Sequence, residues 1–164
     1  MKKFTKYFFY GLIYLFIVFI LAIIFINSSK AEIIKPNNGI EPYQVVKIQL
    51  RGLQNNDKPK KNNGIVQTWE FAHPSNKRYT GPLTKFINMI NSDAYKMLLN
   101  HIDNEIIEVF KSDIKYGFEV KILSKDKNYY KFQWVVERYL DEGPLNNCWL
   151  TTMVSSPISL GSSI

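Results

Sequence analysis

The chain has 164 residues and a formal net charge of +7, a length that predicts one domain. Beyond the first 40 residues it holds 16 basic and 13 acidic side chains, a net charge of only +3. This small excess excludes the strongly basic surface that nucleic-acid-binding domains carry. The one cysteine, Cys148, excludes an intrachain disulfide, and we interpret it as a small buried hydrophobic side chain.

An uninterrupted apolar run follows a short basic N-terminus. Residues 1–6 contain three lysines, and the 20 residues Tyr7–Ile26 contain no charge. Twenty helical residues span about 30 Å, which is the thickness of the hydrocarbon core of a bilayer. We therefore predict a single helix that crosses the lipid bilayer. The lysines before it exceed those after it, which predicts a cytoplasmic N-terminus and an extracytoplasmic domain.

A cleaved signal peptide is the alternative interpretation of this leader. Ser29-Lys30-Ala31 has the small-x-small pattern of a cleavage site, and cleavage after Ala31 would give a secreted or periplasmic protein. The apolar run is longer than the roughly 7–15 residues of a usual signal peptide, so we favour a retained anchor. Residues 27–40 then form a polar linker, and residues 41–156 form the domain.

The first half of the domain has apolar residues at helical spacing. A helix is expected to begin at Pro42, because proline suits a first helical turn, and to end at Asn55. Further helices are expected over residues 64–73 and 80–90, with one more turn near Tyr95. The residues expected on their buried faces are Tyr43, Val46, Leu50, Leu53, Ile65, Trp69, Ala72, Leu83, Phe86, Ile87 and Ile90.

After residue 101 the apolar residues recur at every second position, as is typical of half-buried strands. Polar turn sequences at residues 126–128 and 141–144 separate these segments. Residues 157–164 are expected to form a frayed tail, with a short pairing at residues 158–160. The expected strands cover residues 105–111, 118–122, 130–137 and 148–154.

Helices followed by strands with short connections indicate an α+β fold. We expect the helices to pack on one face of an antiparallel meander sheet. By analogy, a strongly curved sheet that wraps its helices would resemble the cone-like arrangement of nuclear-transport-factor-2-like domains. The predicted architecture is therefore an N-terminal transmembrane helix followed by a nuclear-transport-factor-2-like domain.

Four groups of residues between Glu41 and Val154 occur in a distinctive order and spacing. They are residues 48–57 (IQLRGLQNND); 71–76 with 80–83 (FAHPSN and TGPL); Tyr95 with Leu98, Leu99 and His101; and Gly143-Pro144 with 148–151 (CWLT). Together they resemble an uncharacterised family, the domain-of-unknown-function family numbered 4864. The resemblance implies the same nuclear-transport-factor-2-like fold. It implies no activity, so no catalytic residue is carried over.

No pattern of residues predicts catalysis or metal binding. The two histidines, His73 and His101, lack the spacing of zinc ligands, and no glycine-rich phosphate loop or nucleophile elbow occurs. His101 with Asp103 or Glu70 is a conceivable acid–base pair. We favour a structural histidine with satisfied hydrogen bonds. We expect no cofactor.

Aromatic residues are numerous, and a partly open aromatic pocket is one interpretation of them. Cys148 and Trp149 lie next to each other on the last predicted strand, so we expect their side chains to point to opposite faces. If Trp149, Thr151 and Met153 form an apolar outer face, that face is a candidate dimer or partner surface. The candidate pocket residues are Phe71, Tyr95, His101, Trp134, Cys148 and Trp149.

These patterns favour a non-catalytic binding or interaction module that is tethered to the membrane. We expect contact with a second copy or another protein through the outer face of the sheet, and no nucleic acid. The alternative is a protein that binds a small hydrophobic ligand, or an enzyme acting on one, in the cavity of the cone. In that alternative, His101 and the nearby aromatic residues would line the site.

Overall fold

The computed structural model describes residues 13–19 and 32–162. The chain divides into two compact units, Met1–Glu32 and Ile33–Ile164. Residues 13–19 of the first unit are helical, and the rest of the predicted span Tyr7–Ile26 lies outside the described residues, as does the predicted cleavage site. Within the described ranges, no helix has the length and apolar character needed to cross a membrane.

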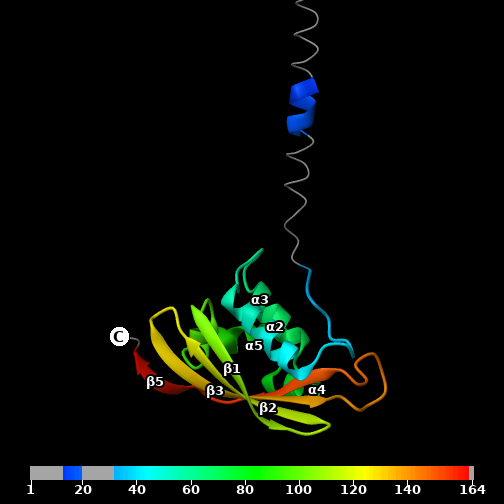
Figure 1. Cartoon of the computed structure of the whole chain (residues 1–164), viewed down its shortest axis with the longest axis vertical. Coiled ribbons are helices and arrows are strands. Elements are labelled where there is room, and N and C mark those ends of the chain that lie inside the picture. Colours follow the sequence, from blue (N-terminus) through cyan, green and yellow to red (C-terminus); the bar gives the residue numbers. More distant parts are fainter. Residues whose placement is uncertain (1–12, 20–31, 163–164) are drawn as a thin grey trace, which may run out of the picture. The chain divides into compact units, whose positions relative to one another are not determined.

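The second unit is an α+β domain, as predicted. Figure 1 shows its helices gathered on one face of a curved sheet. The helices precede all the strands in the chain, which is the order that the sequence indicated. The elements are α2 (Pro42–Gln54), α3 (Asn63–Glu70), α4 (Pro74–Thr80), α5 (Leu83–Asn91), η2 (Lys96–Leu98), β1 (Asp103–Lys111), β2 (Lys115–Leu123), β3 (Asn128–Arg138), β4 (Trp149–Val154) and β5 (Ile158–Ser162).

The sheet is an antiparallel meander in the order β1-β2-β3-β4, and β5 also pairs with β3. The two last strands share one edge of β3, because β4 pairs with residues 134–138 and β5 with residues 128–131. Between them, the Ser155 N–H donates to the Gln133 carbonyl oxygen at 2.9 Å, and the Ser155 hydroxyl accepts from the Gln133 N–H at 2.9 Å. The expected tail therefore continues the sheet as far as residue 162.

The helical layer packs on the sheet through α2. Glu41 and Gln44 form a capping box before and within the first turn, and Pro42 occupies the start of the helix. The buried residues of α2 are Val45, Val46, Gln49, Leu50 and Leu53, together with Pro42. The expected stripe was wrong at Tyr43, which is exposed because the buried face is centred one position further along the helix.

α2 and α3 approach each other so closely that glycine is required at their contact. A Cβ atom added to Gly64 would lie 1.9 Å from the carbonyl oxygen of Gly52, and one added to Gly52 would lie 3.2 Å from the carbonyl oxygen of Gly64. The backbones therefore pack directly on each other at this point.

α4 is the helix that the periodicity missed. Pro74 was expected to end the preceding helix, but that helix ends at Glu70 and Pro74 begins a new one. His73 is its N-cap, with Nδ1 accepting a hydrogen bond of 3.1 Å from the Ser75 N–H. No residue of α4 is buried, so the segment has no apolar period from which it could be recognised.

Part of the expected linker belongs to the compact unit. The side-chain amide of Gln67 makes two hydrogen bonds with the backbone of Ile34. It accepts from the Ile34 N–H at 2.8 Å and donates to the Ile34 carbonyl oxygen at 2.9 Å. Lys35 forms an ion pair of 2.9 Å with Glu70. Residues 33–40 are thus tied to α3, and the domain begins before residue 41.

Candidate functional site

A cavity of about 180 Å³ lies between the helices and the last strands of the sheet. Its walls come from α2, α3, α4, α5, the segment after α5, β3 and β4. None of the described residues that line it carries a formal charge. The residues that line it include Gln49, Phe86, Met89, Tyr95, Trp134 and Thr151.

A buried polar network forms one wall of this cavity. The Oε1 atom of Gln49 accepts hydrogen bonds from the Thr151 hydroxyl at 2.6 Å and from Trp134 Nε1 at 3.0 Å. Its Nε2 atom donates to the carbonyl oxygen of Thr68 at 3.0 Å. One side chain of α2 therefore ties together α3, β3 and β4. Sequence reasoning missed Gln49, although a glutamine on an apolar helical stripe is a signal of this kind of role.

The opposite wall carries two tyrosines with free hydroxyl groups. Tyr95 is half-buried, and its hydroxyl makes no hydrogen bond within the described part of the chain. Tyr79 on α4 is 94% exposed and stands at the edge of the cavity. The cavity thus has mainly apolar and aromatic walls, one hydrogen-bonded polar network and a half-buried tyrosine whose hydroxyl is unpaired among the described residues.

Two of the six candidate pocket residues, Tyr95 and Trp134, line this cavity. Phe71 is buried in the hydrophobic core instead. Trp149 packs with its ring 5.1 Å from Tyr116 and beneath the guanidinium of Arg138 at 4.7 Å. The remaining two candidates, Cys148 and His101, are buried away from the cavity lining.

His101 is a structural histidine. Its Nδ1 atom lies 2.8 Å from the carbonyl oxygen of Leu98, which can only accept, so Nδ1 carries the proton. Its Nε2 atom then accepts from the side-chain amide of Asn104 at 2.9 Å. Both nitrogens are occupied, so neither forms the conceivable acid–base pair. Burial lowers the pKa of His101 and outweighs the Leu98 hydrogen bond and the Asp103 charge, which raise it.

The other reactive groups also lack a catalytic arrangement. Burial raises the pKa of the Cys148 thiol, which favours the unreactive protonated form. In residues 13–19 and 32–162, no three His, Cys, Asp or Glu side chains gather closely enough to hold a metal ion.

The outer face of the sheet differs from the expectation at β4. The Thr151 hydroxyl reaches Gln49 of α2, and Trp149 belongs to the hydrophobic core, so both face the helices. A bulge at Thr152 is the reason: Thr151 pairs with Val136, whereas Met153 pairs with the adjacent Val135. Of the three expected outer residues, only Met153 shares a side of the sheet with Val135, and it also borders the cavity.

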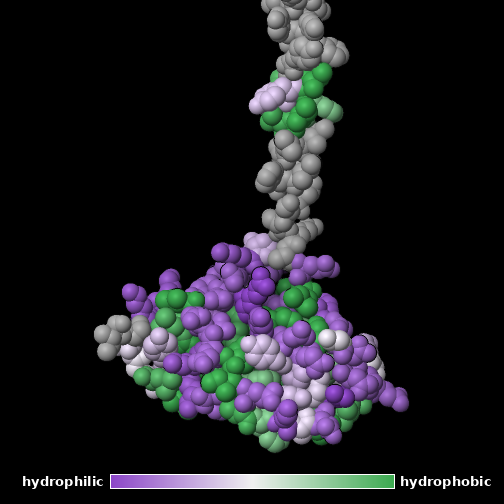
Figure 2. All heavy atoms as spheres, in the orientation of Figure 1, coloured by the Kyte–Doolittle hydropathy of each residue, from purple (hydrophilic) through white to green (hydrophobic). Residues whose placement is uncertain are grey.

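An apolar row nevertheless crosses the outer face. Its residues stand opposite one another on four successive strands, so their side chains share one side of the sheet. Ile107 and Val109 of β1 lie beside the row and are exposed. Hydrophobic surface is visible among hydrophilic atoms where β1 and β3 lie in Figure 2. We call Phe110, Gly117, Val135 and Met153 the outer row.

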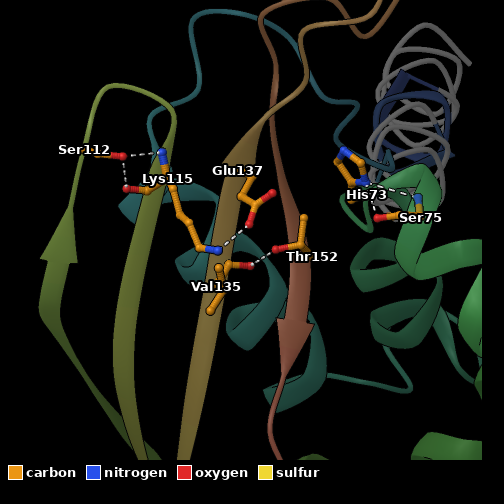
Figure 3. A network of polar contacts seen from close by, with 7 residues as sticks. All are labelled: His73, Ser75, Ser112, Lys115, Val135, Glu137 and Thr152. Carbon is orange, nitrogen blue, oxygen red and sulfur yellow. Dashed lines mark hydrogen bonds and ion pairs between the residues drawn. The ribbon is translucent and has the colours of Figure 1, made fainter.

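An ion pair stands on each side of the outer row. Lys115 and Glu137 approach to 2.9 Å across β2 and β3, as Figure 3 shows. Lys131 and Glu119 approach to 3.1 Å between the same two strands. Each flank of the row therefore carries an ion pair.

No family model, curated protein or solved structure matches the chain.

Proposed function

We propose that this chain is a single-pass membrane-anchored binding module, whose non-catalytic α+β domain lies outside the cytoplasm and pairs with a second copy through the outer row. The observation that carries the proposal is the row itself, since it places exposed Phe110 and Met153 in register with half-buried Val135 and Gly117 across four strands. Contiguous exposed apolar surface of this kind marks interaction sites.

The local shape of the row suits a tightly packed partner. Gly117 has no side chain, and a Cβ atom there would lie 3.5 Å from that of Phe110. Val109 Cγ2 would lie 3.7 Å from the same Cβ position. Gly117 therefore adds no side chain of its own to the row, and a side chain of a facing surface would pack against its backbone, Phe110 and Val109, as side chains do in interface cores.

The charges beside the row favour a second copy as the partner. Each flank has no net charge, because its lysine and glutamate are already paired. Two identical faces then meet without the repulsion that a single-sign surface would produce. A twofold interface uses the same patch on both subunits. The proposed anchor would confine both copies to one membrane and so raise their effective concentration.

The finer identity of the domain is part of the proposal. Helices on one face of a curved antiparallel sheet support a nuclear-transport-factor-2-like arrangement, and the likeness to the domain-of-unknown-function family numbered 4864 stays a prediction. The anchor Tyr7–Ile26 and the extracytoplasmic side rest on the apolar run and the flanking lysines. The absence of clustered metal ligands and the occupied histidine among the described residues support a non-catalytic role.

The test compares two glutamate substitutions in the full chain in lipid nanodiscs. Phe110→Glu places a charge in the outer row, and Leu140→Glu is the control at a similarly exposed apolar residue, 58% against 52%. We expect Phe110→Glu to weaken dimerisation at least roughly tenfold, or about 1.4 kcal/mol, and Leu140→Glu to leave it unchanged. Subunit counting by single-molecule photobleaching measures both. A monomeric wild type, or equal effects of the two substitutions, would contradict the proposal.

A further inference from the structure

We infer that the cavity between the helices and β4 is a binding site for a small neutral aromatic molecule that carries one hydroxyl group. This site meets the outer row only at Met153, which borders the cavity, and none of Phe110, Gly117 and Val135 lines it. The inference therefore does not depend on dimerisation. It rests on the size of the cavity, the absence of charge on its lining, and one available hydroxyl.

The size of the cavity sets the size of the ligand. Protein interiors seldom leave voids larger than a water molecule, so a hollow of about 180 Å³ is much more than a packing defect. An engineered cavity of comparable volume accepts benzene. A ligand of about ten non-hydrogen atoms fits this space, and a lipid chain or a nucleotide does not.

The lining determines the charge of the ligand. The described lining contains no Asp, Glu, Lys, Arg or His side chain. A charged ligand would lose its hydration without gaining a partner of opposite charge. The site therefore favours neutral compounds over anions and cations of the same shape.

The walls favour an aromatic ring. Trp134, Phe86 and Tyr95 present ring surfaces from β3, α5 and the segment that follows α5. Met89 adds a flexible thioether, which makes favourable contacts with aromatic rings. A flat ring can stack or pack edge-on against these side chains.

The polar groups of the walls limit the ligand to one hydrogen-bonding group. The Gln49 side chain already bonds the Thr151 hydroxyl and Trp134. Asn76 donates to the Thr151 carbonyl oxygen at 3.3 Å. The hydroxyls of Tyr79 and Tyr95 have no partner in the described part of the chain. Tyr79 is 94% exposed, so half-buried Tyr95 is the residue that would bond a hydroxyl of the ligand.

The probe is para-fluorophenol, added to the full chain in lipid nanodiscs and followed by fluorine NMR, with empty nanodiscs as the blank. We expect saturable binding to the protein. The phenol should bind at least tenfold more tightly than para-fluorobenzoate, which has a similar ring but a negative charge. Equal affinity for the two probes, or no saturable binding beyond the blank, would overturn the inference.

Two substitutions locate the site. Met89→Trp fills the cavity from a half-buried position and should abolish binding, with thermal unfolding as the check on folding. Tyr95→Phe removes only the hydroxyl and should weaken para-fluorophenol about three- to tenfold while leaving fluorobenzene unchanged. Tyr116→Phe is the matched control, a half-buried tyrosine outside the cavity, and should change neither. Unchanged phenol binding in folded Met89→Trp, or equal losses in the two tyrosine variants, would refute this location.

Discussion

Replacing Gln49 by leucine removes the side chain that connects α2 to the sheet. The amide of Gln49 makes three hydrogen bonds, at 2.6, 3.0 and 3.0 Å, to groups on α3, β3 and β4. Each buried bond contributes about 1 kcal/mol, and the partners would be left unsatisfied. We therefore expect Gln49→Leu to lower the free energy of unfolding by about 3 kcal/mol. Thr151→Val, which removes one of these partners, should cost about 1 kcal/mol.

The double substitution tests whether the network acts as a unit. If Gln49 and Thr151 interact directly, the pair Gln49→Leu and Thr151→Val should cost about 1 kcal/mol less than the sum of the single changes. Gln54→Leu is the matched control: it lies on the same helix and makes one hydrogen bond near the surface, to the Ile102 carbonyl oxygen.

Urea unfolding of residues 33–164, followed by tryptophan fluorescence, measures these free energies. The slope of the free energy against urea concentration should be the same for all variants, because the surface exposed on unfolding does not change. A loss below about 1 kcal/mol for Gln49→Leu would refute the reasoning. So would a loss for Gln54→Leu as large as that for Gln49→Leu, or strict additivity in the double variant.

Two further predictions concern packing and pH. Gly64→Ala should destabilise the domain by roughly 3 kcal/mol or more, because the new Cβ would lie 1.9 Å from a carbonyl oxygen of α2. Gly52→Ala, whose new Cβ would have its nearest contact at 3.2 Å, should lower the free energy of unfolding clearly less in the same urea assay. Burial lowers the pKa of His101 in the folded chain. As the pH falls below about 6.5, the unfolded chain therefore binds more protons than the folded chain does. Stability should therefore be complete above that pH and decrease toward pH 5, and His101→Gln should reduce this decrease; an unchanged pH dependence in the variant would contradict the assignment.

The central strands could be predicted because a strand with one buried face alternates strictly. Phe118, Val120 and Ile122 are buried as the sequence indicated, and so are Phe132 and Trp134. Here the burial of each residue depends only on its parity along the strand. The order of helices and strands, and hence the α+β class, followed from the same periodicity.

The features that were missed depend on tertiary contacts. The bulge at Thr152 reverses which residues of β4 face the helices, and no residue type in that segment predicts a bulge. α4 has a proline start and a histidine cap but no buried face, so the periodicity of apolar residues cannot detect it. The cavity is lined by residues from five or more elements. The sequence shows that aromatic residues are present, but it does not show which of them come close together in space.

Cross-linking between copies of the full chain in a bilayer tests pairing through the outer row directly. Met153→Cys places a thiol in the outer row at a side chain that is 43% exposed, and Tyr79→Cys places one on α4 at a side chain that is 94% exposed. Random collisions would favour the more exposed thiol. We predict that Met153→Cys forms intermolecular disulfides faster than Tyr79→Cys. Faster cross-linking of Tyr79→Cys, or none at Met153→Cys, would contradict pairing through the outer row.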